Sequence, residues 1–173
     1  MILTGHEIEK QVNNGSIVIE PFDLSNLQPN SYDFHLSKYI KVYTNKILDP
    51  KKRNPVKEIE IPKEGLLLKP DELYLGMIEE RMGSKYYVPI LRGRSSTGRL
   101  GLFVHITADL IDIGSINNWT LMLHSVVPVK IYAGMKIGQV TFWVPKGKIE
   151  LYKGKYQGSI KPMESQSFKD YQD

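Results

Sequence analysis

The chain contains no cysteine among its 173 residues. This absence excludes disulfides, thiolate nucleophiles and zinc sites built on cysteine ligands. It also excludes the zinc-dependent nucleobase deaminases, whose metal needs a His/Cys/Cys or three-cysteine site. The four histidines, His6, His35, His105 and His124, show no metal-ligand spacing, and their order with Ser and Asp identifies no catalytic triad.

Long apolar runs and strong charge of one sign are also missing. No run approaches the roughly 20 apolar residues of a membrane-spanning helix, and residues 1–6 lack the features of a signal peptide. Lysine and arginine total 23 against 19 acidic residues, which leaves a net charge of +4 and no dense basic stripe. We therefore expect a cytoplasmic protein that binds neither membranes nor nucleic acid, and whose slight positive charge suits a small anionic ligand. The basic cluster at 51–53 is interpreted as a solvated loop.

Hydrophobic periodicity and turn residues predict a mainly β chain. The length favours one domain with a substantial core. Thr4 and Glu7 form a capping-box pattern, which with the apolar spacing predicts a short helix over 5–12. Glycine and proline separate short predicted strands, which indicates a sandwich or barrel. These strands are expected at 17–20, 30–36, 66–68, 74–79, 87–91, 102–107, 120–124, 129–132 and 139–144.

The C-terminal stretch differs in composition from the rest. Residues 152–173 are polar and rich in glycine, lysine and serine. We expect a single β domain over 1–151 and a flexible tail over 152–173. Two interpretations of the tail stay open: disorder, or a flap that closes over a ligand.

A candidate polyanion site lies at Arg94-Ser95-Ser96-Thr97-Gly98-Arg99. Arginine presents a planar fork that matches phosphate oxygens, and serine hydroxyls add neutral donors. Glycine at position 98 lets the backbone approach a ligand closely. The string on its own is a weak signal for a phosphate site.

Three further polar residues have both a structural and a functional interpretation. Asp112, just before Gly114, either caps local turn amides or orients a water or sugar hydroxyl. Gln139 makes either a strand-edge hydrogen bond or a ligand contact. Asp33 either satisfies local backbone groups or contacts a metal shell.

Taken together and in order, several motifs resemble the nucleotide-binding core of the dCTP deaminase and dUTPase superfamily. They are Arg94–Leu102, His105–Ala108, Ile111-Asp112, Ala133–Gln139, Ser31–Leu36 and Lys155–Gly158. The resemblance implies a distorted β-barrel of the dUTPase-like, β-clip type. It also implies a homotrimer with sites between subunits. The expected ligand is a deoxyuridine or deoxycytidine triphosphate, with Mg²⁺ held mainly through the triphosphate.

The resemblance also implies roles for individual residues. Asp112 would contact the deoxyribose 3′-hydroxyl and the nucleophilic water. Thr120 and Leu121 would present backbone groups to the pyrimidine edge, and Gln139 and Tyr156 would bind phosphates. The residues expected to bind the triphosphate and help orient the base are Arg94, Ser95, Ser96, Thr97, Gly98 and Arg99.

Two positions depart from the pattern of the superfamily. Its deaminases have a proton-shuttling glutamate where this chain has Met122, and a thioether can neither accept nor deliver that proton. General acid–base catalysis contributes about 10²–10⁴-fold, so deamination should be largely lost. Ser115 stands where an aromatic residue packs against the sugar, although Trp119 is an alternative occupant of that space.

These observations lead to a main functional hypothesis and two alternatives. Hydrolysis of dUTP to dUMP and pyrophosphate does not need the missing glutamate, so the chain is predicted to be a dUTP diphosphatase of the archaeal-type branch. The first alternative is a dCTP deaminase that forms dUTP and ammonia. The second is a catalytically inactive nucleotide-binding regulator.

Overall fold

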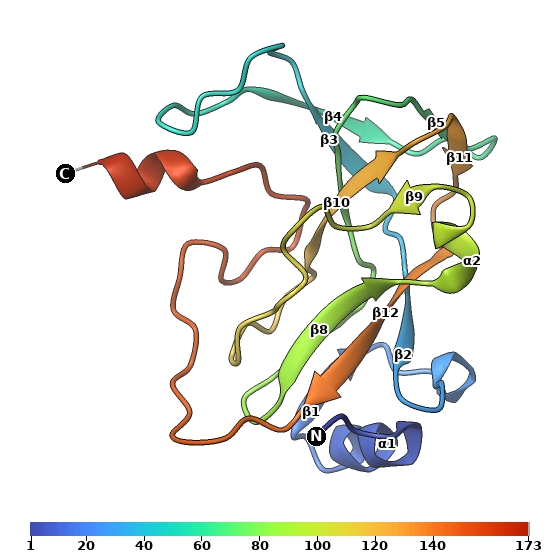
Figure 1. Ribbon diagram of the computed structural model, residues 1–173, viewed down its shortest axis with the longest axis vertical. Coiled ribbons are helices and arrows are strands. Elements are labelled where there is room, and N and C mark those ends of the chain that lie inside the picture. The colour runs from blue at the N-terminus through green and yellow to red at the C-terminus, as the bar shows by residue number, and fades with distance from the viewer. Residues whose placement is uncertain (173) are drawn as a thin grey trace.

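The computed structural model describes residues 1–172 and shows a mainly β chain with a short N-terminal helix and a long C-terminal segment (Figure 1). The helical elements are α1 (Gly5–Asn13), η1 (Leu24–Asn26), α2 (Ser95–Gly98) and η2 (Ser167–Tyr171). The strands are β1 (Ile17–Glu20), β2 (Tyr32–His35), β3 (Tyr39–Tyr43), β4 (Val56–Glu60), β5 (Leu66–Leu68), β6 (Tyr74–Met77), β7 (Arg81–Ser84), β8 (Val88–Gly93), β9 (Leu102–Phe103), β10 (Thr120–Ser125), β11 (Val129–Ile131) and β12 (Lys136–Trp143).

The strands form four antiparallel sheets. Their orders are β1-β7, β4-β3-β6-β10-β9, β11-β5 and β2-β12-β8. The mainly β prediction is therefore confirmed, but no closed barrel forms within residues 1–172, because pairing stops at the edges of four separate sheets. No helix in that range is long and apolar enough to cross a membrane.

The N-terminal helix forms as predicted, with a different cap. Thr4 is the N-cap residue of α1, but its side chain makes no capping hydrogen bond. Its carbonyl instead accepts from the Ile8 N–H at 2.9 Å. The capping-box prediction is thus wrong, and the helix is held by its buried face, since Ile8 is completely buried.

Several parts of the chain differ from the predicted elements, and one of them is β7, for which no strand was predicted. The hairpin of β3 and β4 was not predicted, because β4 is rich in charge and shows little apolar alternation. The strand predicted over 102–107 shortens to β9, Leu102–Phe103. Residues 51–53 are exposed at the tip of the hairpin, as expected for a solvated loop.

One hydrophobic core holds the sheets together and orients the central strand β10. Tyr32, Phe34 and Phe142 are fully buried, as are Leu121 and Leu123 of β10. Burying each such side chain stabilises the fold by about 1.5–3 kcal/mol. Because β10 turns alternate residues inward, its other face is left for the C-terminal segment and the site described next.

Candidate active site

A cavity of about 560 Å³ lies between the outer face of β10, the loop before it, the β3–β4 hairpin and the C-terminal tail. This volume is in the range of small-molecule sites, about 300–1,000 Å³. Its walls are mostly apolar, with a few polar side chains. The cavity is lined by Tyr43, Leu48, Pro50, Asn54, Leu73, Leu75, Ala108, Leu110, Ile111, Asp112, Ser115, Asn117, Trp119, Thr120, Met122, Tyr152, Tyr156, Ser159, Met163, Ser165 and Ser167.

Two residues on the outer face of β10 line this cavity. Thr120 and Met122 are half-buried and reach the cavity, whereas the side chain of Leu121 points into the core. The thioether of Met122 therefore occupies the wall. Any contribution of Leu121 to ligand binding has to come from its backbone, as the sequence analysis expects.

Asp112 lies in the loop before β10 and its side chain is exposed at the cavity. Its carbonyl accepts from the Ser115 N–H at 3.0 Å, which closes a tight turn over Gly114. Gly114 has a φ of 93°, a conformation that favours glycine. The backbone thus turns sharply and leaves the carboxylate accessible to solvent and ligand.

Ser115 and Trp119 lie together in the same wall. The Trp119 indole N–H donates to the Ser115 carbonyl at 3.3 Å, and both residues line the cavity. Trp119 is 4% exposed. An aromatic ring is therefore present in the cavity although position 115 is a serine.

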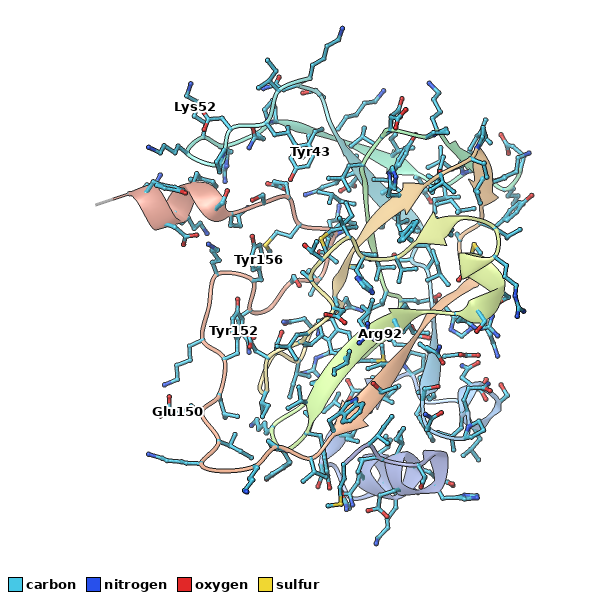
Figure 2. The ribbon with its side chains drawn as sticks, in the orientation of Figure 1. Tyr43, Lys52, Arg92, Glu150, Tyr152 and Tyr156 are labelled. Carbon is cyan, nitrogen blue, oxygen red and sulfur yellow. The ribbon has the colours of Figure 1, made fainter. Side chains whose placement is uncertain are left out.

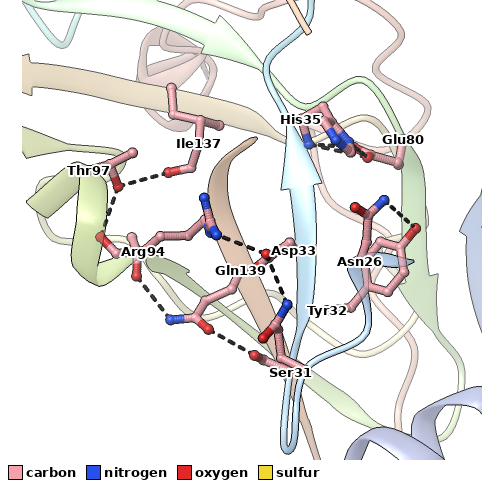
Figure 3. A network of polar contacts seen from close by, with 12 residues as sticks. Asn26, Ser31, Tyr32, Asp33, His35, Glu80, Arg94, Thr97, Ile137 and Gln139 are labelled. Atoms are coloured by element: carbon pink, nitrogen blue, oxygen red, sulfur yellow. Dashed lines mark hydrogen bonds and ion pairs between the residues drawn. The ribbon is translucent and has the colours of Figure 1, made fainter. Parts of the chain in front are cut away.

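The predicted phosphate-binding residues other than Tyr156 form a second group, away from the cavity. Arg94 Nε lies 3.2 Å from a carboxylate oxygen of Asp33, which is 1% exposed (Figure 3). The ion pair leaves the other N–H groups of the guanidinium for a ligand. Thr97 Oγ is used within the chain, because it donates to the carbonyls of Arg94 and Ile137. The second group comprises Arg94, Ser95, Ser96, Thr97, Gly98, Arg99 and Gln139.

Gln139 and Asp33 are both engaged within the chain. The Gln139 amide N–H donates to the Gly93 carbonyl at 3.2 Å, and its oxygen accepts from the Ser31 hydroxyl at 2.8 Å. Both contacts are hydrogen bonds within the sheet, but not at its edge, because β12 is the central strand of the order β2-β12-β8. Asp33 meets side chains, Arg94 and Gln28, rather than the local backbone groups expected for it.

Exposure in α2 leaves room for a ligand. Ser95, Ser96 and Arg99 are exposed, and a Cβ added at Gly98 would meet no atom within 4 Å. The chain itself therefore does not need glycine at position 98. Figure 1 shows α2 and the tail on opposite sides of the sheets, so Arg94–Arg99 and Asp112 do not share one site within a single chain.

The tail runs along the loop before β10 and closes one side of the cavity. The Gly158 N–H donates to Asn117 Oδ1 at 2.7 Å, and the Met163 N–H donates to Thr120 Oγ at 3.0 Å. The Ser165 N–H donates to the Tyr43 hydroxyl at 2.9 Å. Tyr152 and Tyr156 belong to this tail, and Figure 2 shows where they lie along it.

Tyr156 lines the cavity, and its hydroxyl accepts from the Gln166 N–H at 3.0 Å. Further along, Lys41 Nζ lies 2.9 Å from Glu164 Oε2, and both side chains are largely buried. Burial raises the pKa of Glu164, but the hydrogen bond and charge of Lys41, with the charge of Arg53, lower it below its usual value. The tail is therefore attached by an ionised carboxylate.

Several residues of the cavity were not identified from the sequence. Tyr43, Leu48 and Asn54 come from the hairpin, and Asn117 binds the tail. No motif marks these positions.

No group of three or more His, Cys, Asp or Glu side chains within residues 1–172 is arranged to hold a metal ion. Magnesium is usually held by one or two carboxylates together with substrate phosphates. The donor set fits an ion that arrives with a triphosphate rather than one held in a protein cage. Magnesium binding stays a prediction.

Comparisons with known proteins agree with the superfamily resemblance and correct the main functional hypothesis. A protein of Clostridium beijerinckii named "dCTP deaminase, dUMP-forming" is 47% identical over 99% of both chains. One of Cytophaga hutchinsonii with the same name is also 47% identical over 99% of both. These names contradict the predicted dUTP diphosphatase and favour the dCTP deaminase alternative. The prediction was wrong because it depended on the single residue Met122, whereas the similarity to these relatives extends over nearly the whole chain.

Solved structures support the fold. The 2′-deoxycytidine 5′-triphosphate deaminase of Agrobacterium tumefaciens aligns with a TM-score of 0.66 at 19% identity, over 83% of this chain and 48% of that one. The family described as dCTP deaminase-like matches residues 2–144. The chain therefore belongs to the dCTP deaminase-like family.

Proposed function

We propose that this protein converts dCTP to dUMP. The reaction consumes two waters: one replaces the amino group at C4 of cytosine and releases ammonia, and the other cleaves the triphosphate and releases pyrophosphate. The observation that supports this proposal most directly is the identity of 42–47% to relatives named "dCTP deaminase, dUMP-forming", over 99% of this chain. The sequence alternative of a deaminase is kept, with dUMP rather than dUTP as the product.

The cavity supplies the nucleoside part of the proposed site. Trp119, Leu75 and Leu110 give it apolar walls suited to a pyrimidine and a deoxyribose. Asp112, exposed at the cavity, is suited to bind the 3′-hydroxyl and to orient the water that attacks phosphorus. The triphosphate, with its Mg²⁺, would meet Arg94, Arg99 and the serines between them.

Because these two groups lie apart in one chain, we expect the complete site to form between copies, in a homotrimer. Exposed apolar side chains next to α2, β9 and β10 support such a contact. They are Leu100, Phe103, Val126 and Val127, each at least 50% exposed.

A second candidate function is nucleotide binding without turnover. Met122 supports it, because this residue of the cavity wall has no proton to exchange with a bound pyrimidine. The two candidates differ in products and not in binding.

Purified protein with dCTP and Mg²⁺, assayed for ammonia, dUMP and pyrophosphate, separates the candidates. We expect all three products in equal amounts, and their loss with a chelator. An Asp112→Asn variant should still bind dCTP in calorimetry but lose pyrophosphate release about 10²-fold or more. Tight binding of dCTP without any product would instead establish the non-catalytic function.

A further inference from the structure

Arg92 is a charged residue that the proposed function does not yet use. It lies in β8, two residues before Arg94, and its side chain is 54% exposed. The backbone at Arg94 is still extended, with φ of −83° and ψ of 149°. Side chains of an extended segment alternate between its two faces, so Arg92 and Arg94 project to the same side, about 6.5–7 Å apart along the chain. Two arginines at this spacing can bind different oxygens of one triphosphate.

The register of the sheet β2-β12-β8 places Arg92 in a row of polar residues on the outer face of that sheet. Gln139 of β12 is paired with Arg92 on one side and with Asp33 on the other. Residues that are directly paired share a face of the sheet. The next pair in the same register, Leu91 with Val140, is buried in the core. Arg92 therefore lies on the same face as Asp33, whose carboxylate contacts the guanidinium of the predicted phosphate-binding arginine.

Asp109, in the loop before β10, holds one end of the Arg92 guanidinium. Arg92 Nη1 lies 2.8 Å from Asp109 Oδ2. The loop is attached to β8 next to this pair, because the Leu91 N–H donates to the Asp109 carbonyl at 2.8 Å and the Ile111 N–H donates to the Pro89 carbonyl at 3.0 Å. A guanidinium has five N–H donors, so this contact leaves others for a ligand.

Arg92 also lies between the two groups of the proposed site. Figure 2 shows it on β8, the strand that leads into α2, and its partner Asp109 comes three residues before Asp112. An exposed ion pair holds its partners only weakly. The oxygens of a triphosphate can therefore compete with Asp109 for the guanidinium.

We propose that Arg92 binds the triphosphate of the substrate together with Arg94. This inference rests on the proposed function. The free N–H groups of Arg92 donate to phosphate oxygens, and Asp109 orients the guanidinium while no nucleotide is bound. Because Asp109 competes with the phosphates, removing its charge should strengthen nucleotide binding, whereas removing the charge of Arg92 should weaken it.

Calorimetry with the α,β-imido analogue of dCTP, which does not release pyrophosphate, tests this role. We expect Arg92→Gln to bind the analogue about 10-fold more weakly, the effect of losing one hydrogen bond between charged groups. Its affinity for deoxycytidine, which has no phosphate, should equal that of the wild type. Arg81→Gln is the matched control and should bind both compounds like the wild type, because Arg81 is also half-exposed, at 49%, and lies 3.0 Å from Glu20.

Asp109→Asn distinguishes a ligand contact from a structural role, because it breaks the same ion pair but keeps the guanidinium. We expect this variant to bind the analogue at least as tightly as the wild type, and this expectation is a test even if Arg92→Gln folds poorly. Equal weakening in Arg92→Gln and Asp109→Asn, or a Kd of Arg92→Gln within twofold of the wild type, would overturn this inference. Formation of dUMP from dCTP by the wild type would then leave the proposed function intact. A wild type that neither binds the analogue nor forms dUMP would overturn both.

Discussion

Replacing Thr120 by valine and Tyr43 by phenylalanine should loosen the C-terminal tail while the sheets stay folded. Each change removes one acceptor: Thr120 Oγ binds the Met163 N–H at 3.0 Å, and the Tyr43 hydroxyl binds the Ser165 N–H at 2.9 Å. A hydrogen bond of this kind contributes about 1 kcal/mol net. The double variant should therefore lose about 2 kcal/mol, which raises the population of the detached tail about 30-fold.

Limited digestion with a glutamate-specific protease measures that population, because Glu164 lies between the two attached residues, Met163 and Ser165. Cleavage after Glu164 should accelerate about 30-fold in the double variant, with an unchanged melting temperature of the body. Thr141→Val with Tyr86→Phe, two positions outside the tail contacts named above, is the matched control and should digest like the wild type. Equal cleavage rates in the double variant and the wild type would show that these two bonds do not hold the tail.

Two further predictions concern the core and the pH response. A Cβ at Gly138 would lie 2.2 Å from Phe34 Cζ. Gly138→Ala should therefore destabilise the fold by about 1–3 kcal/mol and lower the melting temperature by roughly 2–12 °C in calorimetry. The control Gly98→Ala, whose Cβ meets no atom within 4 Å, should leave the melting temperature unchanged. Because the pKa of Glu164 is lowered in the folded protein, its ionised carboxylate stabilises the attached tail at pH values above 4.5, its usual pKa. This stabilisation is lost as the pH falls through the lower pKa of the folded protein. The backbone NMR signals of the tail should therefore shift below pH 4.5 in the wild type and not in Glu164→Gln. An identical pH response in the variant would refute the role of the Lys41–Glu164 ion pair.

The predictable part of the fold was the part dictated by neighbouring residues. The helix at 5–13, and the strands β5 and β10, follow from apolar spacing and from bounding glycine and proline. The hairpin of β3 and β4 was missed because its residues alternate between charged and apolar only weakly. Its stability comes from pairing with β6 and from the tail, which local sequence does not report.

The candidate site shows the same division. Asp112, Thr120 and Tyr156 were expected near the ligand, and all three line one cavity. The separation of this cavity from Arg94 was not predictable, because it depends on how the sheets are arranged. The functional hypothesis failed at Met122, where one substitution was taken to decide the chemistry without knowledge of its neighbours.

The sequence by itself determined the family, the mainly β character and the types of residue available for binding a nucleotide. These follow from ordered motifs and from interactions within a few residues. Only the tertiary structure decided that the tail binds Asn117 and Thr120, that Asp33 pairs with Arg94, and that Met122 lies in the wall of the cavity. The physical reason is that these contacts join residues far apart in the chain, and strand register sets their partners after the core has formed.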